Sequence, residues 1–462
     1  MNKKLLTILS LLVLASMILA ACGPAATEAP PPPTEAPVVT EAPVATEVMT
    51  EEPVVTEEPV VTEEPVAFEC TDAIGCVDIA PGEPVHIAYG MVVAGPNESL
   101  GIDSRNGVEI AIDDVGGEIL GHPIKFDGQD TGCNAETGQS AGAALAADPT
   151  IVAVIGTSCS SEARVALPLL SQAGFVVVSP SNTAPDLTAP GSENNYVPAY
   201  ARTAHNDNLQ GTVAAEFVFN ELGFTKVATI HDGSLYADQL RQVFERRFTE
   251  LGGEIVAQEA VSLGQTDMSA NLTAIAAGGP ELIYFPIFMP EGAFIIRQAK
   301  QTPGLENVQL MGADGLFAPE VIEGAAEDVE GFLVSSPALA GEAYTEFLGK
   351  YEAKFGTGPI SIFHAHAYDA FMIVKNAIEQ VVVQDADGTL HVPRQALREA
   401  VAGTTGYQGL IGSLTCNEHL EMSGTVVKEP GDCGAAAVGV WQYHFGDFKI
   451  FTNPEVFWAP SK

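Results

Sequence analysis

The segments GTSCSSEA at residues 156–163 and SPSNTAPDLT at residues 179–188 decide the fold of this chain. Each follows a short β-branched run, IVAVIG and FVVVS respectively, and each is rich in small hydroxyl residues. A buried strand followed by such a loop and a helix is typical of a parallel α/β sheet, where ligands bind beyond the carboxyl ends of the strands. Because a helix start offers free N–H groups and positive potential to an anion, Ser160, Ser161 and Thr183 are predicted to hold a small carboxylate.

The alternation of strands and helices continues from residue 84 onward. Asn206 is the predicted N-cap of one helix and Gly223 its stop. Further strands are expected in the segments PVHIAYGMVV, PIKFDGQD, KVATIHD, ELIYFPIF, VQLMGADG and GFLVSSP. About 380 residues of this pattern exceed what one hydrophobic core usually serves. The expected fold is therefore α/β, with two lobes that are each a parallel sheet flanked by helices.

The amino terminus has the pattern of a bacterial export signal. A lysine pair precedes an apolar stretch from Leu5 to Leu19, which is too short for a convincing membrane-spanning helix. The stretch ends in LAAC, which resembles the lipobox of bacterial lipoproteins. Residues 1–21 are therefore predicted to be a signal peptide, and Cys22 a lipidated residue that anchors the chain to the outer face of the membrane. The alternative is an ordinary signal peptide with a chance cysteine.

Residues 22–69 repeat variants of TEAPV and TEEPVV and contain no lysine or arginine. Such a segment cannot bury enough apolar surface to offset the entropy of ordering, and its prolines and like charges keep it extended. We predict a disordered linker that reaches on the order of 100 Å from the membrane. A structured stalk is the alternative.

The chain is strongly acidic, with 60 acidic residues, 20 basic residues and a formal net charge of −40. This charge argues against binding of nucleic acid, whose phosphates require a basic surface, and against docking on anionic lipid. Solubility outside the cell is the simpler interpretation.

Seven cysteines leave six once Cys22 is assigned to lipid, and an even number is typical of disulfides in an oxidising compartment. The sequence alone does not decide among the possible pairings. A zinc site is the rival interpretation, but the chain has no C-x-x-C pair, and His364 and His366 do not share a helical face. No metal site is expected. Proximity along the chain favours the pairs Cys70 with Cys76, Cys133 with Cys159, and Cys416 with Cys433.

Motifs of the common enzyme classes do not occur in this sequence. TSCSS lacks the G-x-S-x-G turn that exposes a hydrolase nucleophile, and no histidine is placed as its base. QDADGT at residues 384–389 differs from a calcium loop in the position of its glycine and lacks the final glutamate. Without a phosphate-binding loop or a dinucleotide fingerprint, neither catalytic residues nor a cofactor are expected.

Several motifs follow one another in a fixed order from about residue 84 to residue 460. They are GPNESLGIDSRNGVEIAIDDV, Cys133, VIGTSCSS, VSPSNTAPDLT, ARTAHNDNLQG, TIHDGSLYADQL, YFPIFMPEG and LMGADGL. Together they resemble the leucine/isoleucine/valine-binding proteins, the type I periplasmic binding proteins of branched-chain amino acid ABC transporters. The resemblance implies a two-lobed receptor that closes over its ligand, and a disulfide between Cys133 and Cys159.

The resemblance also implies three chain crossings between the lobes, near His205, Ser335 and Gly412. Each lobe is then built from separate segments of the chain. The expected parts are a cysteine-containing loop at residues 70–83, lobe 1 at residues 84–204 and 336–412, and lobe 2 at residues 205–335 and 413–462.

Four residues of the serine-rich segments match ligand-binding positions of the family. Ser160, with backbone contacts from Ser158, and Thr183 are implied to hold the ligand α-carboxylate. Ser181 is implied to offer its carbonyl to the amine. The alternatives are a helix cap at Ser160 and turn chemistry before Pro185.

Two residues of the second lobe match the family's cleft. Tyr236 matches a tyrosine of the cleft wall, and Asp314 replaces a glutamate that pairs with the ligand ammonium. An amine buried by lobe closure needs such a carboxylate, because burial of an unpaired charge is costly. The alternatives are a packing role for Tyr236 and an Asp-Gly turn at Asp314.

Leu100 and Phe288 stand where the family pattern has cleft tyrosines, which makes the expected pocket more apolar. The expected function is binding of a small amino acid, branched-chain or otherwise apolar, and its delivery to an ABC transporter permease. The alternative is the same fold binding an amide, a urea or an aromatic acid, for uptake or as a sensory receptor. The expected state is a monomeric, lipid-anchored, extracytoplasmic protein that binds no nucleic acid.

Overall fold

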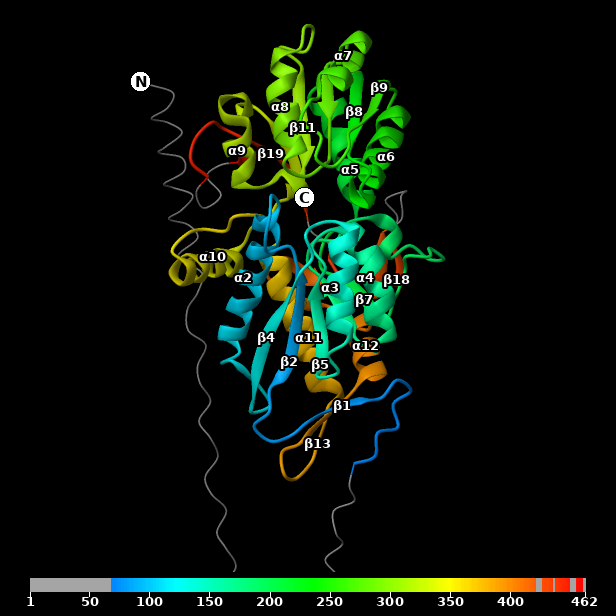
Figure 1. Ribbon diagram of the computed structural model, residues 1–462, viewed down its shortest axis with the longest axis vertical. Coiled ribbons are helices and arrows are strands. Elements are labelled where there is room, and N and C mark those ends of the chain that lie inside the picture. Colours follow the sequence, from blue (N-terminus) through cyan, green and yellow to red (C-terminus); the bar gives the residue numbers. More distant parts are fainter. Residues whose placement is uncertain (1–67, 421–425, 435–436, 449–453, 460–462) are drawn as a thin grey trace, which may run out of the picture. The chain divides into compact units, whose positions relative to one another are not determined.

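The computed structural model describes residues 68–420, 426–434, 437–448 and 454–459, all within the unit Val66–Lys462 (Figure 1). The predicted signal peptide, Cys22 and the linker up to residue 67 lie outside the described residues. Within the described part, no helix is both long and apolar enough to cross a membrane.

The first of two large sheets has eight strands, of which the six inner ones are parallel to one another. Its order is β17 (Glu418–Leu420), β18 (Val426–Asp432), β7 (Tyr200–Arg202), β6 (Val176–Ser179), β5 (Ile151–Gly156), β2 (Val85–Met91), β4 (His122–Asp130) and β3 (Glu118–Ile119). Only the two edge strands, β17 and β3, pair antiparallel with their neighbours. The helices that accompany this sheet are α2 (Glu98–Asp114), α3 (Ala135–Ala146), α4 (Ser160–Gln172), α10 (Glu342–Phe355), α11 (His364–Val381) and α12 (Arg394–Ala402).

The second large sheet has seven strands and a separate hydrophobic core. Its order is β20 (Glu455–Trp458), β19 (Val438–Gln442), β12 (Leu333–Pro337), β11 (Gln309–Ala313), β10 (Leu282–Tyr284), β8 (Lys226–His231) and β9 (Glu254–Ala260). The strands from β12 to β9 run parallel, and β19 and β20 add an antiparallel edge. Its helices are α5 (Asp207–Glu216), α6 (Leu235–Glu250), α7 (Ser269–Gly278), α8 (Glu291–Gln301) and α9 (Pro319–Ala325).

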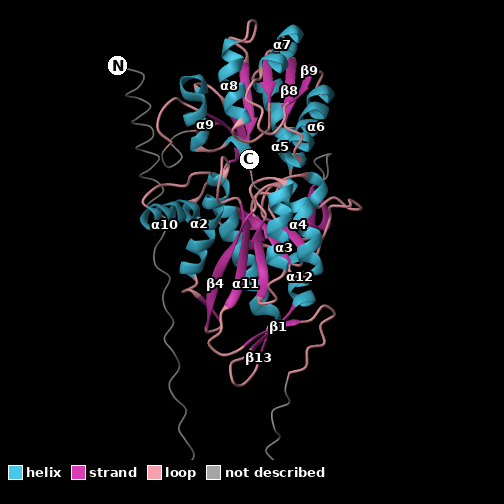
Figure 2. Ribbon diagram, in the orientation of Figure 1, coloured by secondary structure: helices cyan, strands magenta, loops and turns pink. Residues whose placement is uncertain are grey.

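Helices flank the strands in both lobes (Figure 2), which explains the uninterrupted apolar runs of the sequence. In β6, Val177 packs in a cluster with α4, whereas Val176 and Val178 pack in a different cluster with α11. In Figure 1, α11 lies behind β2 and β5. A strand buried on both faces needs apolar residues at every position. The predicted two-lobed α/β fold is confirmed.

The segment near the carboxyl end departs from the predicted lobe boundaries. The prediction placed residues 413–462 in lobe 2, with a crossing near Gly412. Strands β17 and β18 instead extend the first sheet through β7, and only β19 and β20 join the second sheet. The last change of sheet among the described residues therefore follows Asp432, so the prediction was wrong for residues 413–420 and 426–432. The cause is a long-range contact, because Asp432 pairs with Arg202 of β7.

A small three-stranded sheet closes the far end of the first lobe. It consists of β1 (Cys76–Ile79), β14 (Leu390–Pro393) and β13 (Val383–Gln384), all antiparallel. Residues 70–83, predicted as a loop, thus contain a strand. A separate hairpin pairs β15 (Tyr407–Gly409) with β16 (Gly412–Leu414).

The three disulfides favoured by proximity are all present. They are Cys70–Cys76, Cys133–Cys159 and Cys416–Cys433. The first braces the segment that leads into β1, and the third ties the segment after β16 to the end of β18. The second joins the loops after β4 and β5, next to the serine-rich segment.

Candidate functional site

The two serine-rich segments lie side by side at the carboxyl ends of β5 and β6, as predicted. The hydroxyl of Ser181 donates to the carbonyl of Ser158 (2.9 Å), and the backbone N–H of Ala184 donates to the hydroxyl of Ser160 (3.2 Å). The hydroxyl of Ser158 also accepts the N–H of Val92 (3.1 Å), so it is used within the lobe. Neighbouring parallel strands end at the same edge of a sheet, which brings the two loops together.

Gly156 ends β5 in a conformation that only glycine adopts readily, with φ 143°. A Cβ atom at this position would lie 2.3 Å from the carbonyl oxygen of Gly90. The chain can therefore turn from β5 into the serine-rich loop only because position 156 has no side chain.

Thr183 is one of three residues of the second loop, with Asn182 and Asp186, that have a buried polar side-chain atom without a hydrogen-bond partner among the described residues. It is 1% exposed, and its hydroxyl oxygen has no hydrogen-bond partner among the described residues. Buried hydroxyls are nearly always satisfied in folded proteins, so an unpaired one at the end of a strand indicates a place for a ligand.

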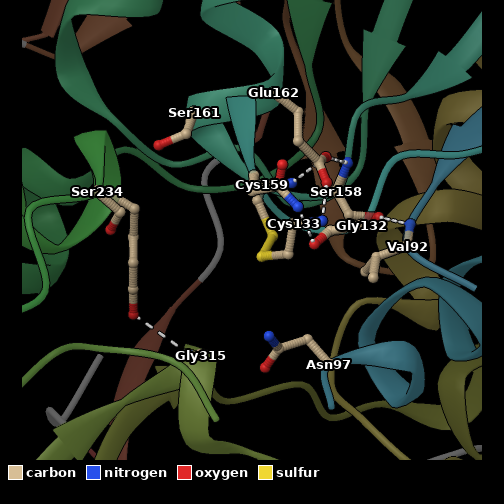
Figure 3. Close-up of a disulfide and its surroundings, with 12 residues drawn as sticks. Val92, Asn97, Gly132, Cys133, Ser158, Cys159, Ser161, Glu162, Ser234 and Gly315 are labelled. Carbon is tan, nitrogen blue, oxygen red and sulfur yellow. Dashed lines mark hydrogen bonds between the residues drawn. A yellow bond between two sulfur atoms is a disulfide. The ribbon is translucent and has the colours of Figure 1, made fainter. Parts of the chain in front are cut away.

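On the second lobe, Asp314 and Tyr236 are in contact, as expected of two cleft residues. The hydroxyl of Tyr236 donates to Asp314 Oδ1 (3.3 Å) and accepts the N–H of Gly315 (3.3 Å; Figure 3). Gln210 donates to the same Oδ1 atom (2.5 Å) and to the carbonyl of Ser335 (2.9 Å). Burial raises the pKa of Asp314 to about 6, although the hydrogen bonds from Gln210 and Tyr236 act to lower it.

Asp207 is a second buried carboxyl that the sequence analysis did not single out. It is the first residue of α5, is fully buried, and neither of its carboxyl oxygens has a hydrogen-bond partner among the described residues. Burial, followed by the charge of Asp314, raises the pKa of Asp207 well above its ordinary value. The hydroxyl of Thr183 offsets part of this shift, although its geometry is not that of a hydrogen bond. The two acids and Thr183 are therefore close neighbours.

The sequence offered only a weak signal for Asp207. The residue lies in the motif HNDNLQG directly after Asn206, whose side chain caps the helix through the N–H of Asn208 (2.9 Å). An aspartate in the first turn of a helix ordinarily needs no functional explanation. Its burial beside Asp314 could not be foreseen, because 107 residues separate the two.

The predicted apolar positions also lie at the boundary between the lobes. Leu100 is buried in one cluster with core residues of the second lobe, and Phe288 packs against this cluster. The rings of Phe288 and Tyr236 have centroids 5.0 Å apart. Both residues thus supply apolar or aromatic surface near the predicted site.

Hydrogen bonds join the two lobes around the same site. Ser161 at the start of α4 accepts the N–H of Leu235 at the start of α6 (3.0 Å). Asn97 both donates to the carbonyl of Met289 (3.2 Å) and accepts its N–H (3.1 Å). Figure 3 shows Ser161, Asn97 and the Cys133–Cys159 disulfide of the first lobe together with Ser234 and Gly315 of the second.

His205 lies at the crossing that joins β7 to α5, and His366 lies in the first turn of α11, where its carbonyl accepts the hydroxyl of Thr203 from that crossing (2.8 Å). Both imidazoles are fully buried, and neither ring nitrogen of His366 has a hydrogen-bond partner among the described residues. Burial, together with the charges of His205 and His364, lowers the pKa of His366 well below 6.5. Burial also lowers the pKa of His205 to about 4.

Stability should therefore depend on pH through His366. Its neutral form is kept in the folded state, whereas the unfolded chain takes up a proton as pH falls below about 6.5, so stability present above that pH is lost below it. Between pH 7 and pH 5 the wild-type protein is expected to lose about 2 kcal/mol more than His366→Leu. Urea unfolding of both proteins at each pH measures this, and parallel pH profiles would contradict it.

One group of described residues has the composition of a metal site, namely Cys133, Cys159 and Glu162. The two sulfur atoms are bonded to each other, so they do not supply the thiolates that a metal would need. The carboxyl of Glu162 is engaged by backbone N–H groups.

Comparison with known proteins agrees with the two-lobed fold. The family model described as "periplasmic binding protein" matches residues 84–428. A leucine-, isoleucine-, valine-, threonine- and alanine-binding protein of Pseudomonas aeruginosa is 25% identical, over 70% of this chain and 86% of its own length. A Leu/Ile/Val-binding protein homolog of Brucella suis is 32% identical over 54% of this chain and 66% of its own length.

Solved structures with the same fold include proteins that bind different ligands. A leucine binding protein of Thermotoga maritima superposes with a TM-score of 0.64 and 27% identity, over 78% of this chain and 95% of its own. A solute binding protein of R. palustris in complex with benzoate has a TM-score of 0.63 at 16% identity, over 82% of this chain and 98% of its own. At that identity the second structure indicates the fold alone.

Proposed function

Because this chain belongs to the periplasmic binding protein family, we propose that it binds a small apolar amino acid between its two lobes and delivers it to the permease of an ABC transporter. One observation carries this proposal. The unpaired hydroxyl of Thr183, on the first lobe, is a neighbour of the buried carboxyl of Asp207, which in turn lies near the buried carboxyl of Asp314 on the second lobe. A zwitterionic amino acid fits this arrangement, because its carboxylate can accept hydrogen bonds from hydroxyl groups and its ammonium can pair with the buried acids.

The roles of the residues follow from this match. The hydroxyls of Ser160 and Thr183, with Ser158 and Ser181 shaping the loops, receive the ligand carboxylate. Asp314 receives the ammonium together with Asp207, because a cation favours the ionised form of both acids and offsets the burial that raises their pKa. The apolar wall is formed by Leu100, Phe288 and Tyr236.

Binding of such a ligand would act as a switch between two shapes. The ligand touches both lobes only when they are closed, so it stabilises the closed form by its differential affinity. The existing contacts between Ser161 and Leu235, and between Asn97 and Met289, would be kept by closure and lost on opening. A permease that recognises only the closed form would therefore bind the protein with its ligand in place.

The proposal includes the location of the protein. The LAAC sequence supports lipidation of Cys22, and the disulfides of the described part suit an oxidising compartment outside the cytoplasm. The protein would then act as a lipid-anchored monomer at the outer face of the membrane, with binding as its only activity.

A second candidate ligand is an aromatic acid, an amide or a urea, for uptake or for sensing. Leu100 and Phe288 favour it, because an apolar wall fits a ring as well as a branched chain. The benzoate complex of the R. palustris protein shows that the fold serves such ligands elsewhere.

A thermal-shift screen of residues 66–462, after removal of bound ligand by partial unfolding, tests both candidates. A ligand that binds only the folded state stabilises it by about 2.7 kcal/mol at 100 times its Kd. We expect leucine, isoleucine or valine to raise the Tm and their methyl esters, which lack the carboxylate, to have little effect. A response to benzoate or an amide but to no α-amino acid would replace the first candidate by the second.

A further inference from the structure

Glu162 is a completely buried glutamate in the first turn of α4. Its Oε1 atom accepts the N–H of Cys133 (2.5 Å), and its Oε2 atom accepts the N–H groups of Ser158 (3.0 Å) and Cys159 (2.8 Å; Figure 3). A glutamate at this helix position commonly reaches back to the N–H of the residue that begins the helix. Here the same carboxyl also reaches a second segment, the loop after β4.

The surroundings of Glu162 match its ionised form. All three partners are N–H donors, and a carboxylate offers two acceptor oxygens, whereas a carboxylic acid would direct one O–H at a donor. Burial opposes ionisation and raises the pKa of Glu162 to about 7, although the hydrogen bonds from the backbone act to lower it. The geometry of the loop therefore depends on keeping a charge that burial disfavours.

The neighbouring helix leaves room for this side chain. A Cβ atom at Gly138 of α3 would lie 2.9 Å from both the Cα and the Cβ of Glu162. The disulfide joins the same two segments through Cys133 and Cys159. The disulfide limits how far the two segments can separate, and the carboxylate orients their N–H groups.

We propose that Glu162 is the positioning residue of the carboxylate-binding loop. By holding the N–H groups of Ser158 and Cys159 inward, it turns the start of α4 so that Ser160 reaches the second serine-rich segment and Ser161 reaches Leu235 of the other lobe. This inference rests on the proposed function for its ligand, whereas the ordering of the loop can be measured without one.

The variant Glu162→Gln tests the proposal because it keeps size and shape. Glutamine has a single acceptor oxygen, so its NH₂ group must face an N–H donor at one of the two segments. We expect affinity for the amino acid that binds wild-type protein to fall about tenfold, measured by calorimetry. Amide hydrogen exchange at Cys133, Ser158 and Cys159 should become about tenfold faster without ligand.

Asp369→Asn is a matched control. Asp369 is also buried, accepts two backbone N–H groups, from Leu410 and Ile411 (both 3.0 Å), and has a pKa raised by burial to about 7. Its partners lie in the hairpin of β15 and β16 and not in the serine-rich loops. This variant should lose stability and keep wild-type affinity, which separates positioning from a general loss of folding.

The outcomes are distinguishable. Unchanged affinity and unchanged exchange in Glu162→Gln would overturn the proposal, as would an equal loss of affinity in Asp369→Asn. If wild-type protein binds no amino acid, the proposed function fails, and the exchange at Ser158 and Cys159 alone decides the role of Glu162. If Glu162→Gln does not fold, Glu162→Asp replaces it; this shorter acid should free the N–H of Cys133 and also weaken binding.

Discussion

Asparagine in place of Asp314 is expected to weaken the binding of an α-amino acid about 100-fold, measured by calorimetry at pH 7.5. Removing one partner of a buried charged pair typically costs 2–5 kcal/mol, and a factor of 100 corresponds to about 2.7 kcal/mol. In the wild-type protein, Gln210 and Tyr236 both donate hydrogen bonds to Asp314 Oδ1. Asparagine keeps one acceptor oxygen, but its NH₂ group is a further donor beside these two. Asp207 remains as a second carboxyl and limits the loss.

The pH dependence of binding should change with the same substitution. The pKa of Asp314 is raised to about 6 in the unliganded site, and an ammonium ligand requires the ionised form. Affinity of the wild-type protein should therefore fall as pH drops below about 6, by up to tenfold per pH unit. Asp314→Asn should lack this component of the profile.

A ligand without an amine provides the control for Asp314. The deaminated carboxylic acid of the best amino acid keeps the carboxylate and the side chain, so Asp314→Asn should affect its binding far less than that of the amino acid. Equal losses for both ligands would instead identify Asp314 as a residue of the turn that follows β11, with a structural effect on the whole cleft. Asp369→Asn again reports any general effect of losing a buried acid.

The sequence predicted the parts of this site that depend on local pattern. The strand runs IVAVIG and VVVS precede small hydroxyl residues, and parallel strands end at one edge, so the meeting of the two serine-rich segments followed from topology. The disulfides followed from proximity along the chain, because short loops close at little entropic cost.

The parts that were missed depend on contacts between distant segments. Asp207 is proposed as a site residue only because Asp314 is its neighbour, and β17 and β18 belong to the first sheet because β18 pairs with β7, where Asp432 lies opposite Arg202. Glu162 reads as an ordinary first-turn glutamate until the loop after β4 is placed against it. Hydrophobic periodicity assigns a residue to a face, but it carries no information about a polar partner elsewhere in the chain.

Arg202→Met is expected to lower the free energy of unfolding by about 3–5 kcal/mol, the cost of breaking a buried ion pair from one side. The guanidinium is fully buried and donates to Asp432 Oδ1 (2.6 Å), 230 residues away in sequence. Burial alone would raise the pKa of Asp432, but Arg202 and then Asn206 outweigh it and hold the pKa below its ordinary value. Methionine would leave this carboxylate without its cation.

Two further variants show whether the loss of stability comes from the broken ion pair or from the removal of an arginine in general. Arg202→Met with Asp432→Leu removes both charges, and it should be more stable than Arg202→Met alone because no carboxylate stays buried after losing its cation. Arg247→Met removes a partly exposed arginine that pairs with Glu216 and Glu250, and it should cost less than about 1 kcal/mol. Urea unfolding measures all three, and a loss for Arg202→Met no larger than for Arg247→Met would contradict the prediction.

Arg202 also connects stability to binding. Its other N–H groups donate to the carbonyls of Asn182 (3.2 Å) and Ala184 (2.8 Å), on either side of Thr183. The same side chain that fixes β18 to the first sheet therefore fixes the loop that is proposed to hold the ligand. Arg202→Met should weaken amino acid binding even at temperatures where it is fully folded, whereas the Cys70–Cys76 disulfide, at the other end of this lobe, could be removed without changing affinity.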